Sequence, residues 1–190
     1  EDGGRSLAQM VSRRAFSGYW EYHIDGALFT APPRSDHSGA GLFNAKGELL
    51  GIGSLVVGNA LGDDHPRTPG NMFVPIDLLK PILGEMRSEG ASRSSSRAWL
   101  GMNCVEQDGD VRVIRVNRDS PAEEAGLLPG DRIVSIDGTA VTHLETLYKT
   151  LWRSAVERDV ALEIRRAGQL QTVTVHSIDR RQILSKPKGI

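Results

Sequence analysis

The chain has 190 residues, of which 39% are hydrophobic and 25% are charged, proportions that are ordinary for a globular protein with one or two small domains. The formal net charge of −1 gives no electrostatic basis for binding nucleic acid or an anionic membrane surface. No apolar run reaches the roughly 18 residues that a membrane-spanning helix needs. Cys104 is the single cysteine, so no internal disulfide can form, and its strand-like context predicts a buried side chain.

The first half of the chain is predicted to be rich in strands. Residues 1–18 are polar, and we expect them to be partly mobile. A strand is predicted over residues 19–30. Two apolar runs, at 41–44 and 49–57, flank a polar turn and predict a β-hairpin, and a further short strand is predicted at 71–75.

A helix and a linker are predicted to close this half. Apolar residues recur at helical spacing over residues 76–87, with Pro81 in an early turn of the predicted helix. Residues 89–96 are rich in Ser and too polar to form a packed core, so we expect a flexible linker there. A phosphorylation or RNA-binding role for this Ser/Arg run is the weaker alternative.

The second half changes pattern after residue 97. Strands are predicted at 111–116 and 132–136, and a hairpin joins strands at 160–166 and 170–177. The predicted domains are therefore 1–88 and 97–180, separated by the linker 89–96 and followed by a tail, 181–190.

Two helices in the second half have sequence signals for their starts. Ser120 precedes Pro121 and is predicted to cap a short helix that ends at Gly126. The segment Thr142–Glu145 has the form of a capping box. It predicts the start of an amphipathic helix that carries Leu144, Leu147, Tyr148 and Leu151 on one face.

Ser38 stands out in residues 35–43, which read Ser-Asp-His-Ser-Gly-Ala-Gly-Leu-Phe. A nucleophilic serine must project its hydroxyl while neighbouring N–H groups point at the developing oxyanion, and glycines permit the tight turn that this requires. The segment resembles the nucleophile loop of trypsin-like serine proteases. The resemblance implies that Ser38 is the nucleophile and that the backbone N–H groups of Asp36 and Ser38 form the oxyanion hole.

Residues 97–179 resemble a PDZ domain. The resemblance rests on the loop Arg-Ala-Trp-Leu-Gly-Met at 97–102, on Ser-Pro-Ala-Glu-Glu-Ala-Gly-Leu at 120–127, and on Pro-Gly-Asp and Ile-Asp-Gly at 129–131 and 136–138. A trypsin-like domain followed by a PDZ domain is the arrangement of the HtrA (DegP-like) proteases. The expected fold class is therefore mainly β: half of a trypsin-like double β-barrel, then a PDZ domain, a small barrel-like sheet with two helices.

The PDZ resemblance implies a site for peptide C-termini. Backbone N–H groups after Trp99, those of Leu100, Gly101 and Met102, are expected to converge on the terminal carboxylate of a peptide that adds to the following strand. Leu147 and Leu151 are candidates for the side-chain pocket, with a purely structural role in the core equally favoured. For His143, a solvated position in the first helical turn is favoured over contact with a ligand hydroxyl.

The serine loop departs from the family pattern in two places. Asp36 stands where the family has a glycine whose N–H binds the oxyanion, so its carboxylate is expected to disturb the hole. His37 directly precedes the serine, but adjacent side chains on a tight turn rarely align, so we do not expect it to be the base. In the family the triad His and Asp come from a first barrel, and only 37 residues precede Ser38; this chain is expected to hold the second barrel alone.

The sequence predicts no cofactor and no metal site, because the loop with Asp63, Asp64 and His65 is expected to be solvated. The resemblance implies a serine endopeptidase of unfolded or misfolded proteins that acts as a homo-oligomer, trimeric or larger, in the periplasm or cell envelope. Its expected partners are polypeptide substrates and peptide C-termini, without nucleic acid. The alternative is a catalytically inactive peptide-binding or scaffold protein with a degenerate protease fold.

Overall fold

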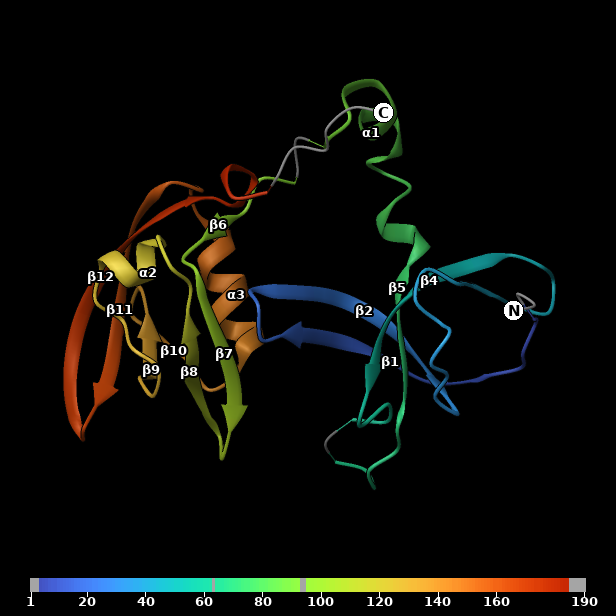
Figure 1. The fold of residues 1–190 in the computed structure, drawn as a ribbon, viewed down its shortest axis with the longest axis horizontal. Coiled ribbons are helices and arrows are strands. Elements are labelled where there is room, and N and C mark those ends of the chain that lie inside the picture. The colour runs from blue at the N-terminus through green and yellow to red at the C-terminus, as the bar shows by residue number, and fades with distance from the viewer. Residues whose placement is uncertain (1–3, 63, 93–94, 185–190) are drawn as a thin grey trace. The chain divides into compact units, whose positions relative to one another are not determined.

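The computed structural model describes residues 4–62, 64–92 and 95–184, and the chain divides into two compact units. The first unit comprises Glu1–Phe16 and Ile24–Ala91, and the second comprises Ser17–His23 and Ser92–Ile190. Both are built mainly from strands (Figure 1). No helix in the described ranges is long and apolar enough to cross a lipid bilayer.

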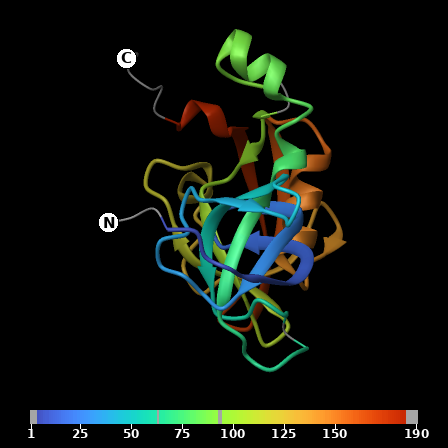
Figure 2. The same ribbon diagram turned by 90° about the vertical axis from the view of Figure 1, so that its right-hand side faces the viewer.

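The first unit is organised around one sheet of five strands in the order β1-β2-β5-β4-β3, which face the viewer in Figure 2. The strands are β1 (Gln9–Gly18), β2 (Tyr22–Ala31), β3 (Gly41–Phe43), β4 (Leu49–Val57) and β5 (Gly70–Pro75). The predicted hairpin is confirmed, because β3 and β4 pair antiparallel. The central strands bury Leu28, Phe29, Met72 and Phe73, so the core lies along β2 and β5.

Two predictions for this unit are wrong. The part of residues 1–18 that forms β1, Gln9–Gly18, is not mobile, because it hydrogen-bonds to β2. Pairing with a neighbouring strand orders a polar segment whose own composition does not indicate order. The single helix expected over 76–87 is two short ones, η1 (Ile76–Leu78) and α1 (Leu83–Glu89). Pro81, which has no N–H to donate, lies in the turn between them.

The second unit is a curled sheet in the order β6-β12-β11-β9-β8-β7, with β10 paired to β9 (Figure 1). Its elements are β6 (Ala98–Trp99), β7 (Met102–Gln107), β8 (Asp110–Val116), α2 (Pro121–Glu124), β9 (Arg132–Ile136), β10 (Thr139–Ala140), α3 (Leu144–Arg153), β11 (Arg158–Arg166), β12 (Gln169–Asp179) and η3 (Arg180–Gln182). The predicted strands and the β11–β12 hairpin are confirmed. One hydrophobic cluster joins the sheet to α3.

The two helices of this unit begin differently. Ser120 caps α2 as predicted, because its Oγ accepts a hydrogen bond from the N–H of Glu123 at 3.2 Å. The capping box predicted at Thr142 does not form. The residue at the N-cap of α3 is His143, and the N–H of Leu144 donates instead to Glu106 of β7, at 2.7 Å. A carboxylate from a neighbouring strand thus replaces the local cap.

Candidate functional site

Three backbone N–H groups between β6 and β7 converge on one carboxylate. Leu100 donates to Oε2 of Glu21 at 3.1 Å, while Gly101 and Met102 donate to Oε1 at 2.8 and 3.0 Å. We call residues 99–102 the 99–102 loop. The predicted N–H groups therefore do form an anion-binding cradle, and the anion within it is a side chain of the same chain.

Gly101 is the residue that allows this cradle to form. Its φ is +85°, a left-handed conformation that residues with a Cβ rarely adopt. A Cβ on Gly101 would also overlap Cβ of Ser120 and would lie 2.9 Å from the ring of Trp99. The loop thus requires glycine for both its backbone conformation and its close approach to the start of α2.

Glu21 reaches the 99–102 loop from the turn between β1 and β2. We call Ser17–His23 the hairpin tip; it belongs to the second unit, beside α3 in Figure 1. The hydroxyl of Tyr148 donates to the carbonyl of Gly18 at 2.8 Å and accepts from the N–H of Glu21 at 3.3 Å. Arg180 donates to the carbonyl of Glu21 at 2.8 Å. The hairpin tip is therefore held at several points.

The electrostatics at Glu21 are balanced between opposing effects. Its side chain is 1% exposed. Burial raises the pKa of Glu21 to about 7, while the three N–H donors and the charge of Arg180 act in the opposite direction. Two neutral groups lie nearby, because burial also raises the pKa values of Cys104 and Tyr148 above their ordinary range. The carboxyl of Glu21 is thus the group here that titrates near neutral pH.

The other residues predicted for the peptide site are buried in this unit. Trp99 lies in β6 and is 7% exposed, and Leu147 and Leu151 of α3 are fully buried in the hydrophobic cluster. A core role is what their packing shows, and their contact with a ligand stays a prediction. His143 is exposed at the start of α3, with Nδ1 3.2 Å from Oε2 of Glu106.

Ser38 lies exposed on a tight turn of the first unit. The N–H of Ala40 donates to the carbonyl of His37 at 2.9 Å, which closes the turn. Two further bonds, from Gly39 to Gly53 at 2.9 Å and from Gly53 to Ala40 at 2.8 Å, fix the turn against β4. A Cβ at Gly53 would overlap the carbonyl oxygen of His37, so a glycine there permits the close approach.

Asp36 is held by Arg34 in a two-pronged ion pair, with Nε–Oδ1 and Nη2–Oδ2 distances both of 2.9 Å. The hydrogen bond from Arg34 lowers the pKa of the Asp36 carboxyl, and the N–H of Asp36 itself adds to this effect. The side chain of Asn71 fixes the backbone of Arg34 through its N–H at 2.7 Å and its carbonyl at 2.9 Å. The backbone N–H predicted for the oxyanion hole is thus one of the groups that favour the charged form of the Asp36 carboxyl.

His37 does not activate Ser38. Its ring is buried, 7% exposed, with its centroid 6.4 Å from that of Phe73. Neither ring nitrogen has a hydrogen-bond partner among the described residues. This agrees with the expectation that His37 is not the base, since a base must lie within hydrogen-bond reach of the hydroxyl.

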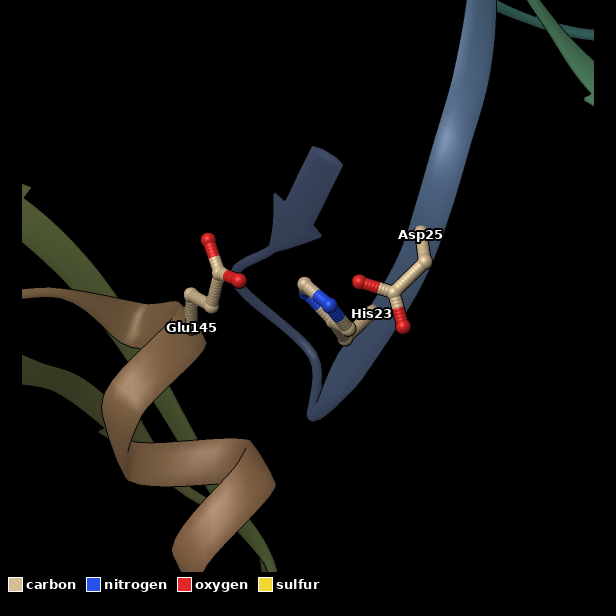
Figure 3. A group of neighbouring side chains, drawn as sticks. All are labelled: His23, Asp25 and Glu145. Carbon is tan, nitrogen blue, oxygen red and sulfur yellow. The ribbon is translucent and has the colours of Figure 1, made fainter. Parts of the chain in front are cut away.

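Among the described residues, no cluster of possible metal ligands lies within either one of the two units. Asp63, in the polar loop, lies outside the described residues. Figure 3 shows His23 at the start of β2 and Glu145 in the first turn of α3. His23 Nδ1 is 2.9 Å from Ser17 Oγ, and Glu145 pairs with Lys149 at 2.6 Å. Asp25, also drawn there, belongs to the first unit, so the three residues are not a site within either unit.

The sequence did not predict Glu21 as a residue of this site. It lies 80 residues before Gly101, and no sequence motif links the turn that holds Glu21 to the 99–102 loop. The available signal was composition: Glu21 is the single acid in the aromatic run Tyr19-Trp20-Glu21-Tyr22. A carboxylate among aromatic side chains is costly to bury unless it meets donors, which points to a partner elsewhere in the chain.

The chain is similar to known proteins over most of its length. Residues 98–176 match the family model of the PDZ domain. A DegP-like periplasmic serine endoprotease of Hahella chejuensis is 29% identical over 173 residues, which cover 80% of this chain and 34% of that protein. The serine protease HhoA of Synechocystis is 26% identical over 94% of this chain and 46% of that protein. The chain is a homologue of the HtrA/DegP-like serine proteases.

Solved structures of HtrA proteases have the same fold over part of their length. The HtrA-type protease AlgW with a decapeptide matches with a TM-score of 0.52 and 22% identity, over 82% of this chain and 50% of that one. The chain thus spans about a third to a half of the HtrA proteins it matches. The expected family and the mainly β fold class with a PDZ domain are confirmed.

Proposed function

We propose that the PDZ domain of this HtrA homologue binds the free C-termini of polypeptides. One observation carries the proposal: the N–H groups of Leu100, Gly101 and Met102 already converge on a carboxylate. The adjacent strand β7 is the last of its sheet, paired with β8 on one side. A cradle for a carboxylate beside a strand edge is the arrangement that an added peptide strand uses.

A peptide with an apolar C-terminal residue is expected to bind the 190-residue chain with a Kd in the micromolar range, on the order of −8 kcal/mol or weaker. Amidation of that terminus removes the charge that the three N–H groups recognise, so binding should weaken strongly. Calorimetric titration with the acid and the amide of one peptide measures this difference. Equal affinity for the two forms would show that the 99–102 loop does not read the carboxylate.

For the full-length protein we propose the activity of a serine endopeptidase, with Ser38 as nucleophile and polypeptides as substrates. The relatives described as serine endoproteases support it, as does the exposed position of Ser38 on a tight turn. The DegP-like relative is described as periplasmic, which supports the same compartment here, and a homo-oligomeric assembly stays part of this proposal. The His and Asp of the triad would come from outside the 190 residues.

A second candidate function is peptide binding without proteolysis. The observation that favours it is the ion pair between Arg34 and Asp36, which holds a charged carboxylate on the residue whose N–H an oxyanion hole would use. Purified full-length protein with its Ser38→Ala variant as control discriminates between the two. Casein cleavage that depends on Ser38 supports the protease, and its absence supports the binding protein.

The 190-residue chain by itself is expected to show no serine-dependent turnover. The imidazole of His37 is buried without a hydrogen bond, and a serine hydroxyl without a base is a poor nucleophile at neutral pH. Casein and a small ester substrate should be turned over no faster by the chain than by its Ser38→Ala variant. A difference between the two would reveal a base for Ser38 within these residues.

A further inference from the structure

The hairpin tip makes both kinds of contact that a bound peptide makes. Such a peptide places its terminal carboxylate on the loop and adds its backbone to the strand edge. Here the Glu21 carboxylate accepts the three N–H groups of the 99–102 loop. The carbonyl of Tyr19 accepts the N–H of Cys104 at 2.9 Å. Met102 and Cys104 are alternate residues of β7, as one edge of a strand requires.

We propose that the hairpin tip is an internal ligand of the PDZ domain, with the Glu21 side chain in the place of a peptide's terminal carboxylate. The inference rests on the proposed binding of C-termini and names the regulation of that site. A peptide and Glu21 cannot hold the same three N–H groups at once. A C-terminus therefore binds the fraction of molecules in which the hairpin tip has been released, which lowers its apparent affinity.

The hairpin tip is both well held and replaceable. Tyr148 and Arg180 bind its backbone at Gly18 and Glu21, which makes it the resting occupant of the loop. Against this, Glu21 has a left-handed backbone with φ of 53°, unfavourable for a residue with a Cβ, and its carboxyl is fully buried. A peptide's terminal carboxylate reaches the loop without a left-handed residue such as Glu21, so it can compete.

A peptide that displaces the hairpin tip also releases the connection between two strands of the first unit. The tip is continuous with β1 and β2, strands of the sheet that carries the Ser38 turn. Its release by a peptide frees the chain segment between two strands of that sheet.

The test compares the 190-residue chain with its Glu21→Ala variant, which removes the side chain that accepts the three N–H groups. Glu124→Ala, at an exposed glutamate of α2 in the same unit, is the matched control. The probe is one peptide with an apolar C-terminal residue and a free carboxylate. Without Glu21 the three N–H groups have no internal acceptor, so we expect Glu21→Ala to bind this peptide about tenfold more tightly.

A second measurement needs no peptide. Amide hydrogen exchange at Leu100, Gly101 and Met102 in the free chain should be slow in the wild type and faster in Glu21→Ala, with Glu124→Ala like the wild type. Measurable but equal peptide affinities in wild type and Glu21→Ala would overturn the internal ligand alone. Absence of binding in every variant would overturn the peptide-binding function, and the competition with it, whatever the exchange rates show.

The pH dependence has a defined sign. Burial raises the pKa of the docked Glu21 to about 7 from an ordinary 4.5, so docking is strongest below the ordinary value and weakens as the pH rises through 7. Peptide affinity should therefore increase from about pH 5 to pH 8, and this gain should be absent in Glu21→Ala. The other ionisable groups near Glu21 are Arg180, Cys104 and Tyr148, with His23 in the hairpin tip. All of them are the same in both proteins, and burial raises the pKa values of Cys104 and Tyr148 above their ordinary range.

Discussion

Replacing Gly101 with Ala is expected to destabilise the PDZ domain by about 3 kcal/mol. About 1–2 kcal/mol comes from a Cβ on a residue with left-handed φ, and a similar amount from overlap with Ser120 and Trp99 in a packed region. Urea unfolding followed by tryptophan fluorescence measures the effect. The three tryptophans, Trp20, Trp99 and Trp152, all lie in the second unit, so the signal reports on that unit.

Gly109→Ala is the matched control. Gly109 has φ of +76°, close to the +85° of Gly101, but no atom lies within 4 Å of the position that its Cβ would occupy. The control therefore carries the conformational cost alone, about 1–2 kcal/mol. Equal losses in the two variants would mean that the approach of the 99–102 loop to α2 relaxes without cost.

Local signals in the sequence predicted most of the second unit. The alternation of apolar and polar residues at 111–116 and the hairpin pattern at 160–177 are set by residues close together in the sequence. Strands β8, β11 and β12 form where these patterns predict them. Ser120 was found because its capping bond spans three residues. The resemblance to a PDZ domain implied that the N–H groups of residues 100–102 bind a carboxylate, and the structure shows them converging on one.

Long-range contacts account for what the sequence did not predict. The cap of α3 comes from Glu106, 38 residues before Leu144, so no capping box could reveal it. Strand β1 is ordered by pairing with β2, although its polar composition suggests mobility. Glu21 is the clearest case, because its partners follow it by about 80 residues. Such contacts depend on how the chain folds back, which local patterns do not encode.

Replacing Asp36 with Gly is expected to raise the turnover of the full-length protein, if Ser38 is its nucleophile. The change removes a carboxylate beside the developing oxyanion and frees the N–H that now serves this carboxylate. One oxyanion-hole donor is worth on the order of 10²–10³ in turnover, which sets the upper limit of the gain. It should appear in kcat for a small peptide substrate, while binding of C-terminal peptides by the PDZ domain stays unchanged.

Two further variants separate charge from backbone freedom. Asp36→Ala removes the carboxylate but keeps a Cβ, so it should recover only the electrostatic part of the gain. Arg34→Gln removes the cation that pairs with Asp36 at 2.9 Å and leaves an unpaired negative charge near the oxyanion, so turnover should fall.

Asp36 is not among the described residues with a positive φ, so its present conformation is unstrained. A gain in Asp36→Gly that Asp36→Ala does not share would therefore mean that the hole forms only when residue 36 leaves this conformation. Unchanged turnover in both, with the fold intact, would show that the loop presents its N–H despite the ion pair.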